Sequence, residues 1–247
     1  MRDVAFFVTC LTDTYYPRVG EAVVRVLRHF GCKVVFPERQ TCCGQPAFNS
    51  GCHSAAAAAA RRMIRVFEPY ETIVTPSASC ATMVRRHFAE LLADDADRAA
   101  AERLGNRTHE FATFLSRVLN VNIAEHLKFD EPITFHYPCH ARDVYTLPEL
   151  VGWLSDGGAV DLRTPEHPDL CCGFGGVFAV DHPEISSAML GDKLRELSAT
   201  GAELVISNEA GCTLHMSGGA HRRGVPLRFK HLAECLAESL GLMEPEP

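Results

Sequence analysis

Short apolar runs alternate with segments of helical periodicity along the first half of the chain. A run of roughly four to eight apolar residues is typical of a buried strand, whereas apolar residues three and four positions apart are typical of a helix. The runs predicted as strands are residues 4–9, 33–36 and 72–75, and the segments predicted as helices are residues 20–30, 54–67 and 80–92. Gly31 supplies a helix stop signal and Ser54 a plausible N-cap. This alternation predicts an α/β fold, with parallel strands flanked by helices.

The second half of the chain shows the same alternation. Its predicted strands are residues 133–136, 160–162 and 204–207, and its predicted helices are residues 148–154, 183–198 and 231–240. The first half carries in addition a charged stretch at residues 93–108, which we expect to form a solvated helix or an excursion from the fold.

The cysteines reveal that the two halves are copies of one unit. Cys10 has a counterpart in Cys139, and Thr41-Cys42-Cys43-Gly44 has one in Leu170-Cys171-Cys172-Gly173; both offsets are 129 residues (139−10 and 171−42). Cys80 and Cys212 are 132 residues apart, and the ends of the halves are also alike, at residues 111–115 and 232–236. A repeated pattern of this kind indicates a duplication. We therefore predict two pseudo-symmetric α/β repeats, at residues 1–125 and 126–247.

Composition restricts the class of protein. The chain has 247 residues with a formal net charge of -7, and nucleic-acid-binding domains are usually basic, so we expect no nucleic-acid partner. No run approaches the roughly 18 apolar residues of a transmembrane helix, and the first ten residues do not resemble a signal peptide. We expect a cytoplasmic protein. That compartment keeps thiols reduced, so the 11 cysteines, an odd number, favour metal binding or catalysis over disulfides.

The positions of the repeated cysteines indicate what they bind. Ligands collect at the carboxyl ends of parallel strands, and every repeated cysteine follows a predicted strand. Each half therefore brings four thiols to one edge of its sheet. Thiolates are soft ligands that suit an iron–sulfur cluster or zinc. The predicted ligands are Cys10, Cys42, Cys43 and Cys80 in the first half, and Cys139, Cys171, Cys172 and Cys212 in the second.

Several residues near these cysteines have weaker interpretations. Gly44 and Gly173 allow the backbone to turn and approach a cofactor closely. Ser77 and Glu209 each precede the last cysteine of their half by three positions and are candidates for oxygen ligands or hydrogen bonds. The remaining candidates are His140 and His215 to line the site, His136 as a core residue, Cys32 and Cys235 as packing residues, and Cys52 beside the first cysteine set.

At this point the chain resembles the family of cysteine-rich CCG-domain proteins. The family pattern is a cysteine, a gap of some thirty residues, Cys-Cys-Gly, a similar gap and Cys-x-x-Cys. Within it, the phrases at residues 7–13, 42–51, 76–80 and 171–178 resemble the lactate utilization protein A (LutA/YkgE) group. One departure is that Ser77 and Glu209 replace the first cysteine of each Cys-x-x-Cys. The non-cubane cluster geometry of relatives with the full set is therefore not carried over.

The resemblance implies a function for the chain. It implies an iron–sulfur oxidoreductase subunit that transfers electrons within a complex oxidising L-lactate to pyruvate, with one or two clusters per chain, [4Fe-4S] in type. No ferredoxin-type cysteine run, flavin motif or NAD motif is present, so we expect other iron–sulfur subunits as partners. A small 2-hydroxy acid is the candidate substrate, with Arg142, Arg222 and Arg223 as candidate partners of its carboxylate.

Two other functions remain open from the residues alone. Four thiolates also suit tetrahedral zinc, so the chain could be a zinc-binding structural subunit of such a complex. The vicinal pairs Cys42-Cys43 and Cys171-Cys172 could instead serve a thiol–disulfide redox protein, although such proteins more often use Cys-x-x-Cys.

Overall fold

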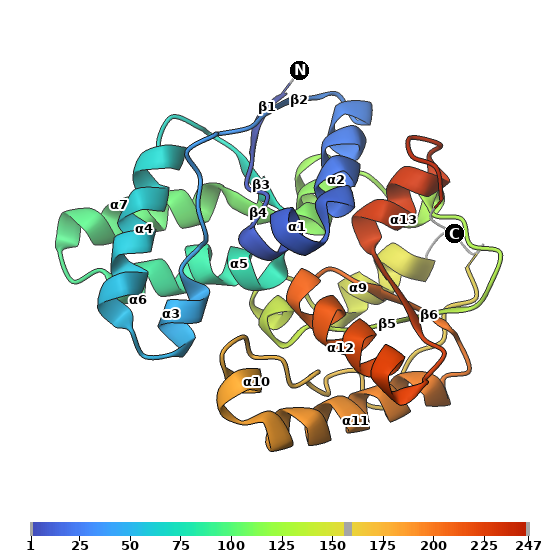
Figure 1. The fold of residues 1–247 in the computed structure, drawn as a ribbon. Coiled ribbons are helices and arrows are strands. Elements are labelled where there is room, and N and C mark those ends of the chain that lie inside the picture. Colours follow the sequence, from blue (N-terminus) through green and yellow to red (C-terminus); the bar gives the residue numbers. More distant parts are fainter. Residues whose placement is uncertain (1, 156–159, 246–247) are drawn as a thin grey trace.

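The computed structural model describes residues 2–155 and 160–245, which form two parallel sheets flanked by helices (Figure 1). The first sheet has the order β2-β1-β3-β4 and the second the order β5-β6-β7. The strands are β1 (Arg2–Phe6), β2 (Cys32–Val35), β3 (Ile73–Thr75), β4 (Thr108–Glu110), β5 (Ile133–Phe135), β6 (Leu204–Ser207) and β7 (Arg228–His231). The predicted α/β class is confirmed.

The second sheet repeats the order of the first. A parallel bridge joins Ile133 to Leu162, so the segment around Leu162 lies beside β5 as β2 lies beside β1. The predicted strand at residues 160–162 is thus reduced to a single bridge. Strands β4 and β7 were not predicted, because Thr-His-Glu and Arg-Phe-Lys-His carry too little apolar character to stand out. Their pairing with β3 and β6 makes them strands.

Most predicted helices are present, with altered ends. Those of the first half are α1 (Cys10–Tyr15), α2 (Pro17–His29), α3 (Gln45–Asn49), α4 (His53–Phe67), α5 (Ala78–Thr82), α6 (Phe88–Leu91), α7 (Asp95–Arg107) and α8 (Phe111–Thr113). Those of the second half are α9 (Leu147–Ser155), α10 (Phe178–Asp181), α11 (Pro183–Ala199), α12 (Ala210–Arg223) and α13 (Leu232–Ser239). Shorter π-helical and 3-10 turns cover Met83–His87, Phe114–Val118, Ile123–His126 and Cys139–Asp143. The charged stretch at residues 93–108 is mainly helix α7, which Asp94 caps.

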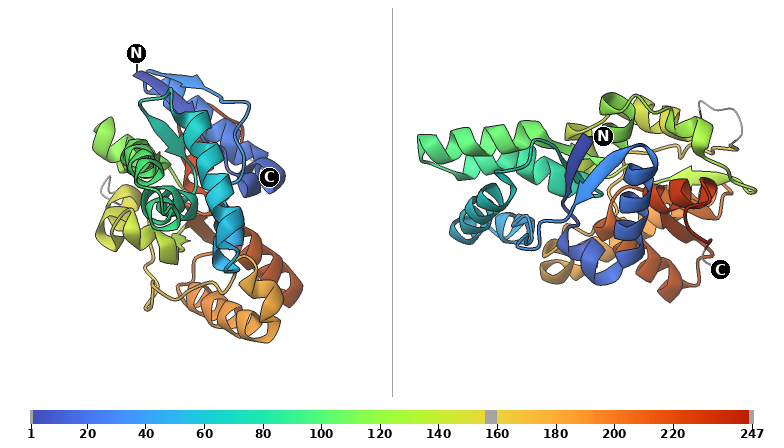
Figure 2. Two further views of the ribbon diagram at one scale, coloured as in Figure 1. Left: turned by 90° about the vertical axis from the view of Figure 1, so that its left-hand side faces the viewer. Right: turned by 90° about the horizontal axis from the view of Figure 1, so that it is seen from above.

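Alternate residues of each strand face different cores. In β1, Val4 and Phe6 point into a core shared with the second half, whereas Ala5 points into a core of the first half alone. The shared core also contains Phe135 and Ile206 from the second sheet. Helix α2 covers this side of the first sheet, and α4 and α7 cover the other (Figure 2). The two repeats are therefore packed against each other through one face of each sheet.

Helix α13 of the second half packs on α2 of the first, and both appear side by side in Figure 1. His231 begins α13 with a reciprocal capping arrangement, in which its side chain accepts from Ala233 N–H and Glu234 accepts from the His231 backbone. The other ring nitrogen of His231 bonds the carbonyl of Pro76 at 2.8 Å. His231 thus ties the last helix of the second half to the loop that precedes α5, the helix that carries Cys80.

In the described ranges, none of the helices is long and apolar enough to cross a membrane.

Candidate metal centre

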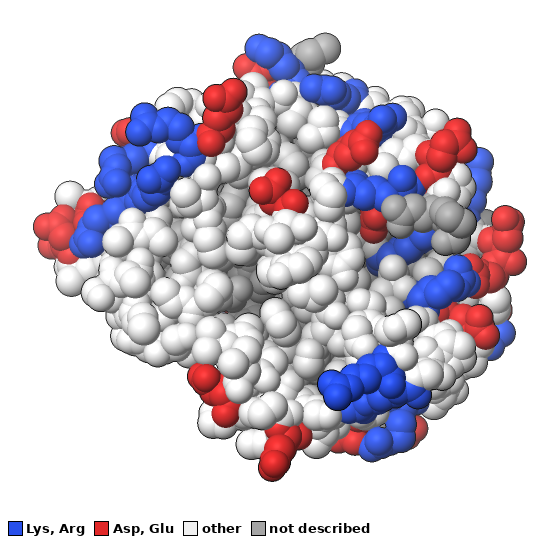
Figure 3. Space-filling model, in the orientation of Figure 1, with Lys and Arg blue, Asp and Glu red and all other residues white. Residues whose placement is uncertain are grey.

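All eight repeated cysteines line one cavity of about 380 Å³. Each lies in the segment that follows a strand or the bridge at Leu162, on the side where the carboxyl ends of parallel strands meet. Helices α1, α3, α5, α10 and α12 contribute to its wall. On the face shown in Figure 3, the molecule is hollowed between these helices, and Lys, Arg, Asp and Glu side chains lie mainly around the hollow rather than in it. The two sets of four thiols therefore share one weakly charged cavity.

The first set consists of two close thiol pairs. Cys10 Sγ lies 3.5 Å from Cys42 Sγ, and Cys43 Sγ lies 3.4 Å from Cys80 Sγ. Thr9, directly before Cys10, has a φ of 71°, a strained backbone conformation for a residue with a side chain. Two thiolates bound to one tetrahedral metal atom are about 3.8 Å apart, given metal–sulfur bonds of about 2.3 Å. The pairs are close enough to share a metal atom.

The second set repeats this arrangement. The thiol of Cys139 pairs with that of Cys171, and the thiol of Cys172 pairs with that of Cys212. Cys139 Sγ also lies 3.6 Å from His140 Nδ1. In both sets the glycine after the vicinal cysteines donates its N–H to the first of them, with Gly44 N 3.4 Å from Cys42 Sγ and Gly173 N 3.4 Å from Cys171 Sγ.

Both glycines adopt a backbone conformation that side chains disfavour. Gly44 and Gly173 each have a φ of +84°. A Cβ at Gly173 would lie 2.7 Å from the carbonyl oxygen of Ser186 and 2.9 Å from Cβ of Met189, both in α11. The neighbour that requires a glycine here is the helix behind the cysteine loop, and the close approach to a cofactor stays a prediction.

Hydrogen bonds link the thiols of each set, and Cys42 and Cys171 each accept more than one of them. Bonds from Cys10, Cys43 and the Gly44 N–H lower the pKa of Cys42, against the effect of burial. The corresponding bonds lower the pKa of Cys171. The pKa values of Cys10 and Cys139 are raised, because Cys10 donates to Cys42, Cys139 donates to Cys171, and both are partly buried. The surrounding donors thus stabilise the thiolate form of Cys42 and Cys171, and a bound metal would displace protons from the thiols that hold it.

Ser77 and Glu209, which replace cysteines of the family pattern, contact each other. Ser77 Oγ lies 3.1 Å from Oε1 and 3.0 Å from Oε2 of Glu209, and Ser79 N–H donates to Oε2 at 2.8 Å. Ser77 Oγ also accepts from Cys80 N–H, which caps α5. Glu209 and Ser77 are both buried and line the cavity. Ser77 and Glu209 were candidates for oxygen ligands or for hydrogen bonds, and the hydrogen bonds are present.

His136 lies closer to the second set than the sequence indicates. It is buried as expected, with 1% exposure, but its ring comes within 4.8 Å of the sulfurs of Cys172 and Cys212, measured from the nearest ligand atoms. Neither ring nitrogen has a hydrogen-bond partner among the described residues. Burial lowers the pKa of His136 to about 3, and the nearby charge of Lys193 acts in the same direction. The only signal in the sequence was a histidine where the first half has Phe7.

Of the remaining histidines, cysteines and arginines considered for the site, most lie outside the lining of the cavity. His140 lines the cavity, whereas His215 pairs with the Ser186 hydroxyl at 3.3 Å, outside the lining. Cys32 and Cys235 are buried in the shared core, and Cys52 is exposed outside the lining. The three arginines considered for carboxylate binding, all of them described, also lie outside it: Arg142, Arg222 and Arg223. Arg142 instead donates to the carbonyl of Asp169, and Arg223 to Ser187.

The donor set fits an iron–sulfur cluster or another thiophilic metal group. Eight soft sulfur donors converge, and all 11 cysteines of the chain are free thiols in the described structure. A volume of about 380 Å³ is an order of magnitude more than the roughly 30 Å³ of a water molecule. The space therefore suits groups larger than a single ion.

Comparison with known proteins identifies the family. The model of the CCG cysteine-rich domain family matches the chain twice, at residues 4–85 and 133–217. Lactate utilization protein A 2 of Bacillus cereus (strain 03BB102) is 40% identical over 239 residues, which cover 96% of this chain and 98% of the relative. Lactate utilization protein A of Shouchella clausii (strain KSM-K16) is 40% identical over 236 residues, covering 95% and 98%.

Among solved structures, an ABC-transporter solute-binding protein from Conexibacter woesei aligns with 98% of this chain and 73% of its own, at 14% identity and a TM-score of 0.30, which is too low to relate the two folds. The sequence matches, in contrast, extend over nearly the full length of both partners and include both cysteine sets. The chain therefore belongs to the lactate utilization protein A family and carries its two cysteine-rich CCG domains.

Proposed function

We propose that this chain is an iron–sulfur subunit of a cytoplasmic system that oxidises L-lactate to pyruvate, and that it holds one cluster per repeat. The observation that carries the proposal is the convergence of eight thiols on one cavity. Cys10, Cys42, Cys43 and Cys80 would hold the first cluster. Cys139, Cys171, Cys172 and Cys212 would hold the second. The names of the relatives supply the association with lactate.

Bound clusters of this kind would supply one-electron transfer, which suits an oxidation that removes two electrons from its substrate. The residues around them have supporting roles. The N–H groups of Gly44 and Gly173 donate to cysteine sulfur and so stabilise its negative charge. The wall of the cavity is mostly apolar, with Leu11, Pro46 and Val177 among its members.

Electron transfer to or from this chain requires other subunits in this proposal. The described structure places the cavity at the surface rather than in the interior, since Cys10 and Cys139 at its edge are exposed. A partner with its own cluster could approach there. A 2-hydroxy acid could reach the same opening, where Gln45, Asn49 and His140 are among the polar side chains of the lining.

A zinc-binding structural role is a second candidate, favoured by one observation. The sulfur–sulfur distances of 3.4 and 3.5 Å suit two thiolates on a single metal ion.

Metal and sulfide analysis of the anaerobically purified protein decides between the two. We expect iron and acid-labile sulfide in comparable amounts, with visible absorption and an EPR signal on reduction or oxidation. Cys42→Ser and Cys172→Ser should each remove the iron of one cluster, whereas Cys52→Ser, at an exposed thiol outside the cavity, should keep all of it. Stoichiometric zinc without sulfide after anaerobic reconstitution would overturn the iron–sulfur proposal in favour of the structural one.

A further inference from the structure

His136 is a buried polar side chain without a protein partner. It follows β5, is 1% exposed, and has two ring nitrogens that make no hydrogen bond within the described structure. Leaving a buried polar group unpaired costs about 1–3 kcal/mol, so such groups are rare in native proteins. A partner that is absent from the polypeptide itself would remove this cost.

The first half shows that the fold does not need a histidine at this position. The residue equivalent to His136 is Phe7, which is fully buried and packs edge-on against Phe67 with ring centroids 5.7 Å apart. An apolar ring therefore fills the same place behind the first cysteine set. The polar ring in the second half introduces nitrogen donors where packing alone would favour carbon.

A second difference between the halves lies in the helix behind each cysteine loop. Ser186 and Met189 of α11 stand over Gly173 as Ala56 and Ala59 of α4 stand over Gly44. Lys193, seven residues after Ser186, thus occupies the place of Met63, seven residues after Ala56.

Both of these residues are buried, but they differ in charge. Lys193 Nζ donates to the carbonyl of Pro168 at 3.3 Å and interacts electrostatically with Cys172 and Cys212. Met63 is neutral. The second set therefore has a nitrogen donor and a cation behind it, whereas the first has two apolar side chains.

The geometry points to the nitrogen as a ligand. Cys172 Sγ, Cys212 Sγ and a ring nitrogen of His136 lie within 4.8 Å of one another, a spacing that suits one metal atom bound by all three. Both ring nitrogens are free of hydrogen bonds within the described residues, so either is available to a metal atom.

We propose that His136 is a nitrogen ligand of the metal group bound by the second cysteine set, so that the two repeats hold chemically different sites. The first is an all-sulfur site and the second a mixed sulfur and nitrogen site. This inference rests on the proposed function, in that each set binds a metal group. His136 adds a neutral ligand to the four thiols and removes none of them, so the charge difference between the two sites comes from Lys193, whose positive charge beside Cys172 and Cys212 raises the reduction potential of a centre bound there. The second site is then the more easily reduced of the two.

The first test needs no substitution. The full-length protein is reconstituted anaerobically, with natural or ¹⁵N-labelled histidine, and its paramagnetic state is studied by pulsed EPR. We expect a strong nitrogen coupling, of the size seen for directly bound imidazole, that changes with the isotope. His136→Phe, which recreates the residue of the first half, should lose this coupling and leave the iron and the EPR signal of the first site unchanged. His215→Gln, outside the cavity lining, serves as the matched control and should keep the coupling.

The outcomes separate this inference from the proposed function. A protein that holds iron and sulfide but shows only weak nitrogen coupling, or a strong coupling that survives in His136→Phe, overturns the assignment of His136 and leaves the iron–sulfur proposal intact. A protein without iron and sulfide contradicts the proposed function instead. Cobalt(II) loading of the metal-free protein then decides on His136: a paramagnetically shifted imidazole N–H resonance that His136→Phe removes supports the ligand, and its absence in the wild-type protein overturns it.

Discussion

The hydroxyl of Ser77 donates to the carboxylate of Glu209, 3.0 Å from Oε2, and so joins the two repeats at the positions where the family pattern has a cysteine in each. Both residues are buried at the wall of the cavity. Each repeat therefore lacks a cysteine sulfur at this point, and the two residues that replace it form a hydrogen bond with each other.

Ser77→Ala should destabilise the metal-free protein by about 1–3 kcal/mol, because it removes the N-cap of α5 and one partner of a buried carboxylate. The measurement is urea unfolding under reducing conditions. Ser50→Ala removes an exposed hydroxyl that bonds the carbonyl of Pro46, its one side-chain hydrogen bond among the described residues, and it should change the stability by less than about 0.5 kcal/mol. Equal effects of the two substitutions would contradict the role given to the Ser77–Glu209 contact.

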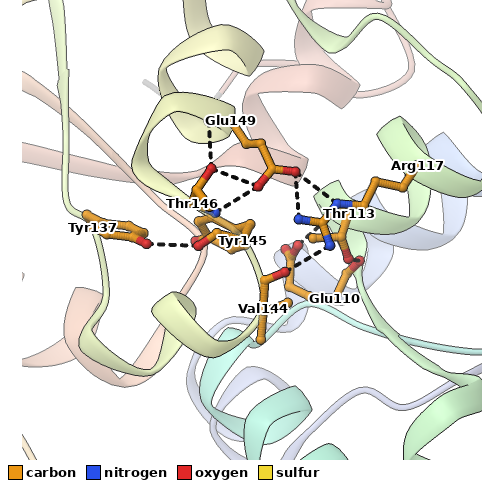
Figure 4. Close-up of polar contacts among 8 residues, drawn as sticks. All are labelled: Glu110, Thr113, Arg117, Tyr137, Val144, Tyr145, Thr146 and Glu149. Carbon is orange, nitrogen blue, oxygen red and sulfur yellow. Dashed lines mark hydrogen bonds and ion pairs between the residues drawn. The ribbon is translucent and has the colours of Figure 1, made fainter.

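Glu110 should make stability depend on pH. It is fully buried, Thr113 N–H donates to its Oε2 at 3.0 Å, and Arg117 beyond it is paired with Glu149 (Figure 4). Burial raises the pKa of Glu110 to about 7, backbone hydrogen bonds oppose the shift, and the charge of Glu209 adds to it. The folded state thus binds this proton more tightly than the unfolded state. The resulting stabilisation is complete below a pH of about 4.5 and is lost as the pH rises to about 7.

Glu110→Gln removes this titration. The stability of the variant relative to the wild type should therefore rise by about 3 kcal/mol between pH 4.5 and pH 7.5, whatever the difference at pH 4.5. Urea unfolding of both proteins across this range checks it. Glu21→Gln, at an exposed carboxylate paired with Arg25, should show no comparable change. A difference that stays constant with pH would show that Glu110 is already ionised at low pH in the folded protein.

Gly173→Ala should be more harmful than Gly176→Ala, although both glycines have a positive φ. A Cβ at Gly173 meets the carbonyl of Ser186 at 2.7 Å, whereas a Cβ at Gly176 meets nothing within 4 Å. We expect a loss of about 1–3 kcal/mol at Gly176 from the backbone alone and a larger loss at Gly173. The unfolding midpoints and the bound iron per chain should both fall further in Gly173→Ala. Similar values for the two variants would mean that α11 yields to the added methyl group.

The lowered pKa values of Cys42 and Cys171 predict selective alkylation of the metal-free protein. At pH 6 these two thiols should react with iodoacetamide faster than Cys52, which is more exposed. Their rates should also change little up to pH 8, whereas a thiol in its protonated form becomes more reactive as the pH rises. Peptide mass spectrometry gives the rate at each site. Preferential labelling of Cys52 at pH 6 would contradict the hydrogen-bonding pattern of the two sets, and reconstitution with iron and sulfide should protect both Cys42 and Cys171.

Much of the fold was determined by local pattern. Strands β3 and β6 and helices α4 and α11 were predicted from local sequence. A parallel strand buried on both faces is a short apolar run, and a helix buried on one face has apolar residues at helical spacing, so both patterns are visible within a few residues. Strands β4 and β7 have no such apolar run. They are short and polar, and only their pairing with a neighbour makes them strands.

The sequence by itself determined the duplication and the two sets of four cysteines, because both depend on residue type and spacing along the chain. Only the tertiary structure decided that the two sets line one cavity, that Ser77 meets Glu209, and that His136 lies beside Cys172 and Cys212. The contact of Ser77 with Glu209 depends on how the repeats pack through their shared core, and residues more than a hundred positions apart leave no trace of that packing in local periodicity. The sequence shows that His136 stands where the first repeat has Phe7. Only the folded chain shows that this histidine lies near the thiols of Cys172 and Cys212.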